Sequence, residues 1–161
     1  MQDITPFLWF ATQAEQAAKF YVSVFNKSKI LGVARYPKDA PGPAGSVMTV
    51  RFRLLGQEFT ALNGGSVYKI TPAVSFVINC KTQKEVDYYW RRLSAGGKKI
   101  QCGWLEDKFG VSWQVVPVQL IELCTDQDPA KAQRVFQTML KMVKLDIAKL
   151  KKAAAATEPR R

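Results

Sequence analysis

The sequence contains no histidine, and this absence narrows its chemistry more than any other feature. Without imidazole the chain cannot assemble a Ser-His-Asp or Cys-His catalytic set, a histidine-based zinc site, or the usual proton shuttle near neutral pH. A site for a hard cation would need clustered carboxylates. The only adjacent acids are Glu106-Asp107, which lie beside a predicted turn, and we expect both to be solvated.

Long apolar runs and cysteine pairs are also missing. No stretch approaches the roughly 20 apolar residues that span a membrane, and the start, Met1 to Pro6, lacks the regions of a signal peptide. Cys80, Cys102 and Cys124 show no C-x-x-C spacing, so we expect neither a disulfide framework nor a zinc site. These features predict a cytoplasmic protein with no membrane partner.

Glycine-rich nucleotide-binding loops are absent as well. Neither Asn63-Gly64-Gly65 nor Gly96-Gly97 forms a G-x-G-x-x-G motif after a strand, and neither opens a predicted helix. Both come where a predicted element ends. We therefore interpret them as turns.

Positive charge is plentiful, and much of it lies near the end of the chain. The formal net charge is +11, and residues 131–161 hold nine lysines and arginines against Asp146 and Glu158. No nucleic-acid-binding motif accompanies this basic segment, so we interpret it as a solvated helical face. The prediction is that nucleic acid is not a partner.

The first half of the chain has the pattern of one strand, one helix and three further strands. Ile4–Phe10 is a predicted strand, and Thr12-Gln13-Ala14-Glu15 predicts a capping box at the start of a helix. A strand over 28–36 and a hairpin with its turn at Leu55-Gly56 follow. If that turn has two residues, Phe52 lies opposite Phe59.

The same order then begins again. Ala73–Cys80 is a predicted strand, and Thr82-Gln83-Lys84-Glu85 is a second capping-box pattern, 70 residues after the first. A helix, a short strand over 98–101 and a hairpin over 102–117 complete the copy. This internal duplication predicts an α+β fold of two βαβββ modules, over 4–65 and 71–117.

A helical extension follows the second module. We expect a domain over 1–125 and a basic helical extension over 126–161, with helix caps at Asp128 and Asp146. An apolar stripe on the first of these helices predicts its buried face. Its members are Ala132, Val135, Phe136, Met139, Leu140 and Val143.

The final strand of the second module separates polar from apolar side chains. Ser112 and Gln114 alternate with Val111, Trp113 and Val115, so an amide and a hydroxyl share one face. A polar face beside aromatic residues suits a partly polar cavity.

Four strings resemble the PhnB-like family of the glyoxalase/bleomycin resistance/dioxygenase (vicinal oxygen chelate) superfamily. They are Thr5-Pro6-Phe7-Leu8-Trp9-Phe10, residues 56–65, Cys102-Gly103-Trp104 and Val111-Ser112-Trp113-Gln114, and the segment 142–147 is similar too. Many members of the family are labelled demethylubiquinone methyltransferase. The resemblance implies paired modules forming a cupped sheet, a homodimer and a small-molecule cavity inside the cup.

The resemblance also indicates where the superfamily's metal ligands would fall. A histidine would fall near Ala73, a glutamate at Gln114, and another histidine at Thr5 or Pro6. Neutral or apolar residues occupy these positions, so we expect no metal and no other cofactor. The methyltransferase label conflicts with the absence of a Rossmann-like pattern and its glycine-rich turn.

The expected function is therefore small-molecule binding without the superfamily metal. The cavity residues that we expect are Phe7, Trp9, Asn63, Ser75, Ser112 and Gln114. Alternative functions stay open: an enzyme of the glyoxalase or dioxygenase kind, the labelled methyltransferase, or an interaction module that acts through the basic extension.

Overall fold

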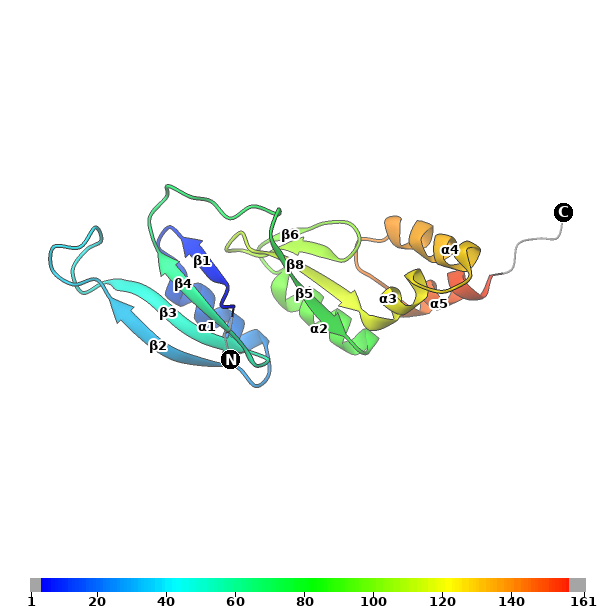
Figure 1. The fold of residues 1–161 in the computed structure, drawn as a ribbon, viewed down its shortest axis with the longest axis horizontal. Helices are drawn as coiled ribbons and strands as arrows, with labels where there is room; N and C mark the ends of the chain where they lie inside the picture. Colours follow the sequence, from blue (N-terminus) through cyan, green and yellow to red (C-terminus); the bar gives the residue numbers. More distant parts are fainter. Residues whose placement is uncertain (1–3, 157–161) are drawn as a thin grey trace. The chain divides into compact units, whose positions relative to one another are not determined.

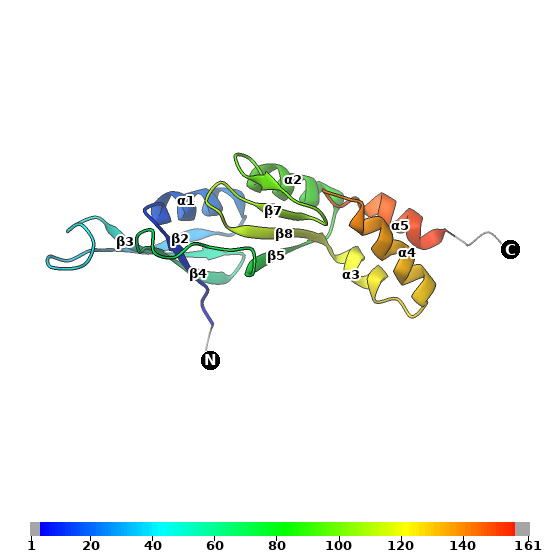
Figure 2. The same cartoon turned by 90° about the horizontal axis from the view of Figure 1, so that it is seen from above.

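The computed structural model describes residues 4–156, so Glu158, Arg160 and Arg161 of the basic extension lie outside the described residues. The chain divides into two compact units, Met1–Thr71 and Pro72–Arg161. Each unit contains a four-stranded sheet with a helix over one face (Figures 1 and 2). The α+β fold with repeated modules is confirmed.

The first unit follows the predicted order of one strand, one helix and three strands. Its elements are β1 (Phe7–Phe10), α1 (Ala14–Val24), β2 (Lys29–Arg35), β3 (Val47–Leu54) and β4 (Gln57–Asn63). The sheet order is β1-β4-β3-β2, with β1 parallel to β4 and the other pairs antiparallel. The hairpin register is confirmed, since Phe52 lies opposite Phe59.

Helix α1 covers one face of this sheet (Figure 2). Ala14, Ala17 and Ala18 are fully buried, and small side chains let the helix approach the strands closely. Tyr21 is also fully buried, and its ring stacks on that of Phe52 with centroids 6.1 Å apart. These buried side chains of α1 form the core of the unit together with the strands beneath them.

The predicted capping box at Thr12 is wrong. The N-cap of α1 is Gln13, whose side chain makes no capping hydrogen bond. Instead Asn63, at the end of β4, accepts a hydrogen bond from the backbone N–H of Ala14 at 2.7 Å. A side chain 49 positions away satisfies the helix start, which a local sequence pattern cannot reveal.

The second unit repeats the arrangement with shorter strands. Its elements up to the sheet's end are β5 (Ser75–Cys80), α2 (Gln83–Leu93), β6 (Lys98–Lys99), β7 (Trp104–Glu106) and β8 (Ser112–Pro117). The order β5-β8-β7-β6 matches that of the first sheet, including the parallel pair. The second capping box is confirmed: Glu85 N–H donates to Thr82 Oγ1, and Glu85 Oε2 accepts from the Thr82 N–H.

The turn between β7 and β8 is organised by a buried carboxylate. Asp107 is 2% exposed, and its Oδ1 accepts from the N–H groups of Phe109 and Val111 while its Oδ2 accepts from Trp113 Nε1 at 2.8 Å. The expectation that Asp107 is solvated is therefore wrong. The three donors offset the cost of burying the charge and fix the hairpin.

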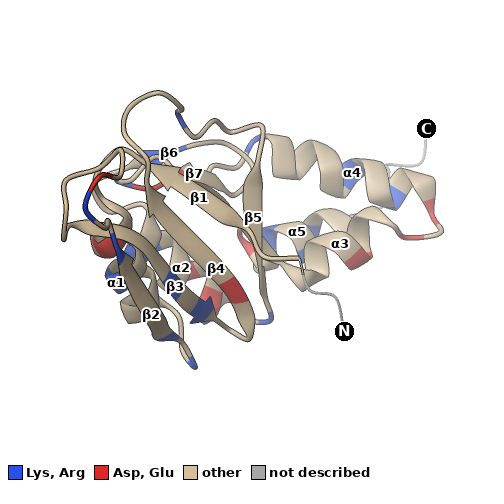
Figure 3. Ribbon diagram, turned by 60° about the vertical axis from the view of Figure 1, so that its left-hand side comes forward, with Lys and Arg blue, Asp and Glu red and all other residues tan. Residues whose placement is uncertain are grey.

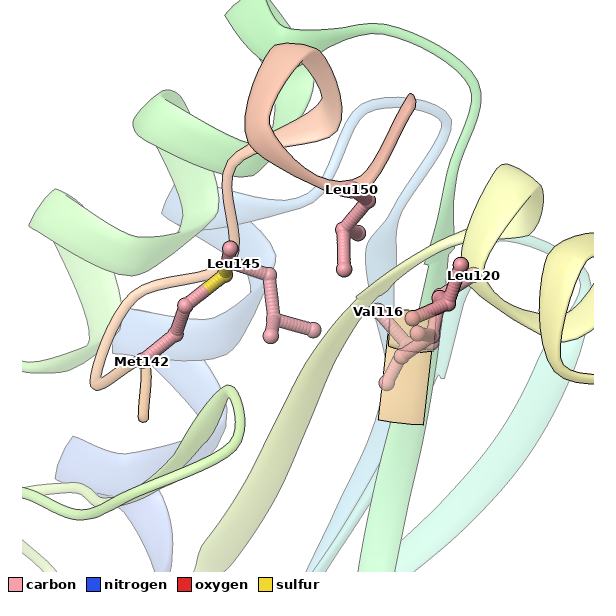
Figure 4. Packing of buried hydrophobic residues seen from close by; sticks show 6 residues of the cluster. Val116, Leu120, Met142, Leu145 and Leu150 are labelled. Atoms are coloured by element: carbon pink, nitrogen blue, oxygen red, sulfur yellow. The ribbon is translucent and has the colours of Figure 1, made fainter. Parts of the chain in front are cut away.

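Three helices follow β8 within the second unit: α3 (Val118–Cys124), α4 (Pro129–Leu140) and α5 (Ile147–Ala155). The predicted caps at Asp128 and Asp146 are confirmed. The helices share one buried cluster with the end of β8 (Figure 4). Its members are Val116, Leu120, Val135, Met142, Leu145 and Leu150.

The predicted buried stripe of α4 is only partly right. Val135 is fully buried, but Phe136 and Leu140 are 46% and 41% exposed, and Val143 beyond the helix is also exposed. Helical spacing identifies the apolar side of a helix, while the width of the buried contact depends on the partners that the fold supplies.

Several basic residues of the extension have partners inside the unit. Lys131 pairs with Asp126 at 2.5 Å, and Lys144 pairs with Asp87 of α2. Arg134 donates from Nε to the carbonyl of Ala153 at the end of α5. Part of the positive charge therefore attaches the extension to the rest of the unit. No helix within residues 4–156 is long and apolar enough to cross a membrane.

Candidate binding faces of the two sheets

The first sheet has one face turned away from α1, here called the first open face. The register pairs Phe7 with Thr60 and Trp9 with Leu62, so these side chains lie on the side opposite the buried Leu8 and Phe10. Phe7 is 59% exposed. Two of the predicted site residues, Phe7 and Trp9, therefore share a face.

The indole of Trp9 is held in place by the segment after β4. A Cβ added at Gly64 would come within 2.3 Å of the ring, so glycine is required for this close approach. Trp9 Nε1 donates to the carbonyl of Gly65 at 2.9 Å, and the ring of Tyr68 contacts it edge-on with centroids 5.0 Å apart. The glycine pair follows the end of β4, as expected, but it does not form the expected turn: its two N–H groups donate to the carbonyls of Phe10 and Ala11, and the segment holds the tryptophan ring.

Asn63 lies elsewhere. It pairs with the buried Phe10 in the register, and its Nδ2 donates to the carbonyl of Val47 while its Oδ1 accepts from Ala14. It borders an open groove of about 510 Å³ between the start of α1 and the loop that contains Pro41. The amide is used for joining β4, β3 and α1, so the structure does not bring Asn63 to the open face.

The second sheet has a corresponding second open face, turned away from α2. Ser75 pairs with Ser112 and Val77 with Gln114, which places the three predicted polar residues together. Gln114 Nε2 donates to Ser75 Oγ at 2.9 Å. Ser112 is 1% exposed, and its Oγ has no hydrogen-bond partner among the described residues.

The sequence prediction missed two residues of this face. Trp104 pairs with Gln114, and Glu106 pairs with Ser112, across the β7–β8 hairpin. Glu106 also forms an ion pair with Lys98 at 2.9 Å. Counting outward from the predicted turn at 108–110 would have placed both beside the polar residues, because a hairpin fixes its cross-strand partners.

Two cysteines, Cys80 and Cys124, are not activated for nucleophilic chemistry. Burial raises the pKa of the Cys80 thiol to about 12, and burial also raises the pKa of Cys124. A nucleophilic cysteine needs a lowered pKa, because the thiolate is the reactive form. Both thiols therefore stay protonated near neutral pH.

The side chains on the two open faces are not suitable ligands for the metal that the resemblance implies. Gln114 is an amide that donates its N–H to Ser75, and its neighbours Ser75 and Ser112 are neutral hydroxyls. Among residues 4–156 no three His, Cys, Asp or Glu side chains gather as a metal site would require. On the first face, Glu58 is paired with Arg51 and Arg53. The chain has no imidazole, and the carboxylates of the two faces, Glu58 and Glu106, are each held in ion pairs with Lys or Arg, so the ligand set that transition metals prefer is not assembled.

Comparisons with known proteins place this geometry in a family. The family described as 3-demethylubiquinone-9 3-methyltransferase matches residues 2–116, so α3–α5 lie beyond the match. The structure of the PhnB protein from Bacillus cereus is similar over 73% of this chain and 100% of that chain, with 36% identity and a TM-score of 0.67. A comparison with curated proteins found no match.

More distant structures share the fold. Protein PA1353 from Pseudomonas aeruginosa has 22% identity and a TM-score of 0.58, over 73% of this chain and 98% of that one. The fosfomycin resistance protein FosX from Listeria monocytogenes has 15% identity and a TM-score of 0.55, over 75% and 94%. By its matched residues and its paired βαβββ modules, the chain belongs to the PhnB-like 3-demethylubiquinone-9 3-methyltransferase family.

Proposed function

We propose that the protein binds a small organic molecule on the open faces of its sheets, without the metal of its superfamily. The observation that carries this proposal is the buried hydroxyl of Ser112, which has no hydrogen-bond partner within residues 4–156 and lies beside the Gln114–Ser75 pair. Buried polar groups are nearly always hydrogen-bonded, so an unpartnered one indicates that a ligand or water completes it.

The chemistry of the second open face suits an oxygen-bearing ligand. An amide can donate and accept, and a hydroxyl can do both, so Gln114 and Ser112 can orient a carbonyl or hydroxyl group. Trp104 lies beside Gln114 in the register and adds aromatic surface. A few polar groups next to rigid aromatic rings are typical of small-molecule sites.

The first open face offers apolar surface. Phe7 is well exposed, and the Trp9 ring is fixed by Gly64, Gly65 and Tyr68. A pre-ordered ring loses little freedom when it binds, which favours affinity. We propose Phe7 and Trp9 as ligand contacts on this face.

The family description names a methyltransferase, and that activity is the second candidate. The described sheets each contain one parallel pair within an otherwise antiparallel order, unlike the parallel sheet of Rossmann-like methyltransferases. We therefore place binding first. Incubation of a confirmed ligand with and without S-adenosylmethionine, followed by mass spectrometry, would show any turnover.

A thermal-shift screen of metabolites, with hits confirmed by tryptophan fluorescence quenching, tests the proposal. Loss of one hydrogen bond costs about 0.5–1.5 kcal/mol, so Gln114→Ala should weaken binding roughly three- to tenfold. For a ligand of the first open face, Trp9→Ala should weaken binding by a larger factor, because aromatic area is lost. Hits that bind both variants as tightly as the wild type would place the site elsewhere.

The metal-free part of the proposal needs its own test. Elemental analysis of protein purified without chelator should find far less than one Zn, Mn, Ni or Fe per chain. Stoichiometric metal that is lost on Gln114→Ala would overturn this part. Metal that is lost on Glu58→Gln would identify a carboxylate site on the first open face instead.

A further inference from the structure

We propose that the ligand of the first open face is an organic anion. Its apolar part would lie against Phe7 and Trp9, and its carboxylate, sulfonate or phosphoryl group would lie beside Arg51. This inference rests on the proposed function, because it takes the open face as the binding surface. It adds the chemical class of the ligand.

One cross-strand row joins the aromatic and basic parts of the face. The registers place Phe7 of β1 beside Thr60 of β4, Thr60 beside Arg51 of β3, and Arg51 beside Gly32 of β2. The side chain of Arg51 is 61% exposed. Neighbouring strands lie about 4.8 Å apart, so the row separates the ring from the guanidinium by about 10 Å at the backbone. This span suits one small amphipathic molecule.

The charge on the face remains positive after its internal ion pairs are formed. Arg51 contacts Glu58 at 3.2 Å, and Arg53 contacts the other oxygen of the same carboxylate. Figure 3 shows basic segments on β3 and an acidic segment on β4 of this sheet. The two arginines hold the pKa of Glu58 below its usual range, so this acid is ionised at neutral pH. One carboxylate shared by two guanidiniums still leaves a net positive charge. Lys29, which lies opposite Arg53 on β2, adds a further positive charge.

Arg51 retains donors for a ligand. Its contact with Glu58 uses Nη2, and a guanidinium carries five N–H groups. Planar, paired donors match the oxygens of carboxylate, sulfonate and phosphoryl groups. The exposed aromatic ring at the other end of the row explains why an organic anion fits better than an inorganic one.

The end of the row at Gly32 is open. A Cβ built at Gly32 meets no atom within 4 Å, and its backbone is not in the left-handed region. A side chain can therefore be placed beside Arg51 without displacing any neighbour. This position allows the charge of the face to be changed while the arginine itself stays in place.

Two fluorescent probes test the proposal: anilinonaphthalene sulfonate, an aromatic anion, and phenylnaphthylamine, which lacks the sulfonate. Arg51→Gln should weaken sulfonate binding about three- to fivefold, the scale of an exposed ion pair, and leave the uncharged probe nearly unaffected. Gly32→Glu should weaken sulfonate binding similarly. Gly32→Gln, which adds a side chain of the same shape as glutamate but without its charge, should not. Lys19→Gln, on the exposed surface of α1, removes one positive charge on the opposite side of the same sheet and should have no effect.

The outcomes separate this inference from the proposed function. If Phe7→Ala weakens both probes but Arg51→Gln and Gly32→Glu do not distinguish them, the face binds ligands and the anion preference is wrong. If neither probe responds to Phe7→Ala, the first open face is not a binding surface, and this inference fails together with the proposed ligand contacts of Phe7 and Trp9, while the site at Ser112 and Gln114 is tested by its own variants. The inference is supported if Arg51→Gln and Gly32→Glu weaken the binding of the sulfonate probe alone. Added salt should weaken the binding of the same probe to the wild-type protein.

Discussion

Ser112 carries a buried hydroxyl that residues 4–156 leave without a hydrogen-bond partner. Such a group costs folding free energy unless a ligand or water satisfies it. Gln114 and Ser75 beside it are already bonded to each other. At the scale of single residues, the second open face therefore combines one satisfied polar pair with one unsatisfied group, which is the pattern of a site that trades stability for binding.

Ser112→Ala should leave the free energy of unfolding of the ligand-free protein unchanged or raise it by up to about 1 kcal/mol, because it removes a group that has no partner. Ser75→Ala should lower the free energy of unfolding by about 0.5–1.5 kcal/mol, since Gln114 loses its acceptor. Urea denaturation followed by tryptophan fluorescence measures both. A larger loss for Ser112→Ala than for Ser75→Ala would show that the Ser112 hydroxyl stabilises the fold.

At the scale of elements, the two sheet-covering helices begin in different ways. Helix α2 starts with a local capping box between Thr82 and Glu85, while α1 depends on Asn63 at the end of β4. The sequence around the two helix starts is nearly the same, with Thr-Gln in both. The difference is that a tertiary neighbour, Asn63, satisfies the start of the first helix in place of a local cap.

The two threonines should therefore respond differently to substitution. Thr82→Ala should lower the free energy of unfolding by about 1 kcal/mol, the usual value of an N-cap. Thr12→Ala should change it by less than about 0.5 kcal/mol, as for a surface site. Chemical denaturation of the two matched variants is the measurement. Equal losses of unfolding free energy would indicate that Thr12 caps α1 as the sequence pattern predicts.

The helices after β8 depend on one buried cluster and not on the whole apolar stripe of α4. Leu150 is fully buried in that cluster, while Phe136 is 46% exposed. Leu150→Ala should lower the free energy of unfolding by about 2–5 kcal/mol, because it leaves a cavity. Phe136→Ala should cost less than about 0.5 kcal/mol. A large loss for Phe136→Ala would mean that its ring is covered in solution.

At the scale of the whole molecule, the internal repeat explains why much of the fold could be predicted. Two copies of the same pattern, 70 residues apart, identified both modules and the order of their elements along the chain, and the two-residue turn at Leu55-Gly56 predicted the Phe52–Phe59 register. The site was harder to predict, because side chains that join elements depend on tertiary contacts. Asn63 is an example, since its type suits a ligand site but its amide caps α1 and bonds Val47.

We also propose that the protein is a homodimer. Each sheet ends in edge strands, and the exposed Val33 on the edge strand β2 and Val77 on β5 are apolar groups that a second copy could cover. Native mass spectrometry at low micromolar concentration should find a species of twice the 18.1 kDa chain mass. A spectrum with the single-chain mass alone would contradict this proposal.

The claim on which the functional account rests is that a ligand completes the hydrogen bonding of Ser112. A crystal structure of the protein soaked with a confirmed hit tests it most directly. The account predicts density for the ligand beside Ser112, with a ligand oxygen or nitrogen within hydrogen-bonding distance of the Oγ atom and of the Gln114 amide. Ligand density at another place, with Ser112 bonded to a protein group, would contradict it.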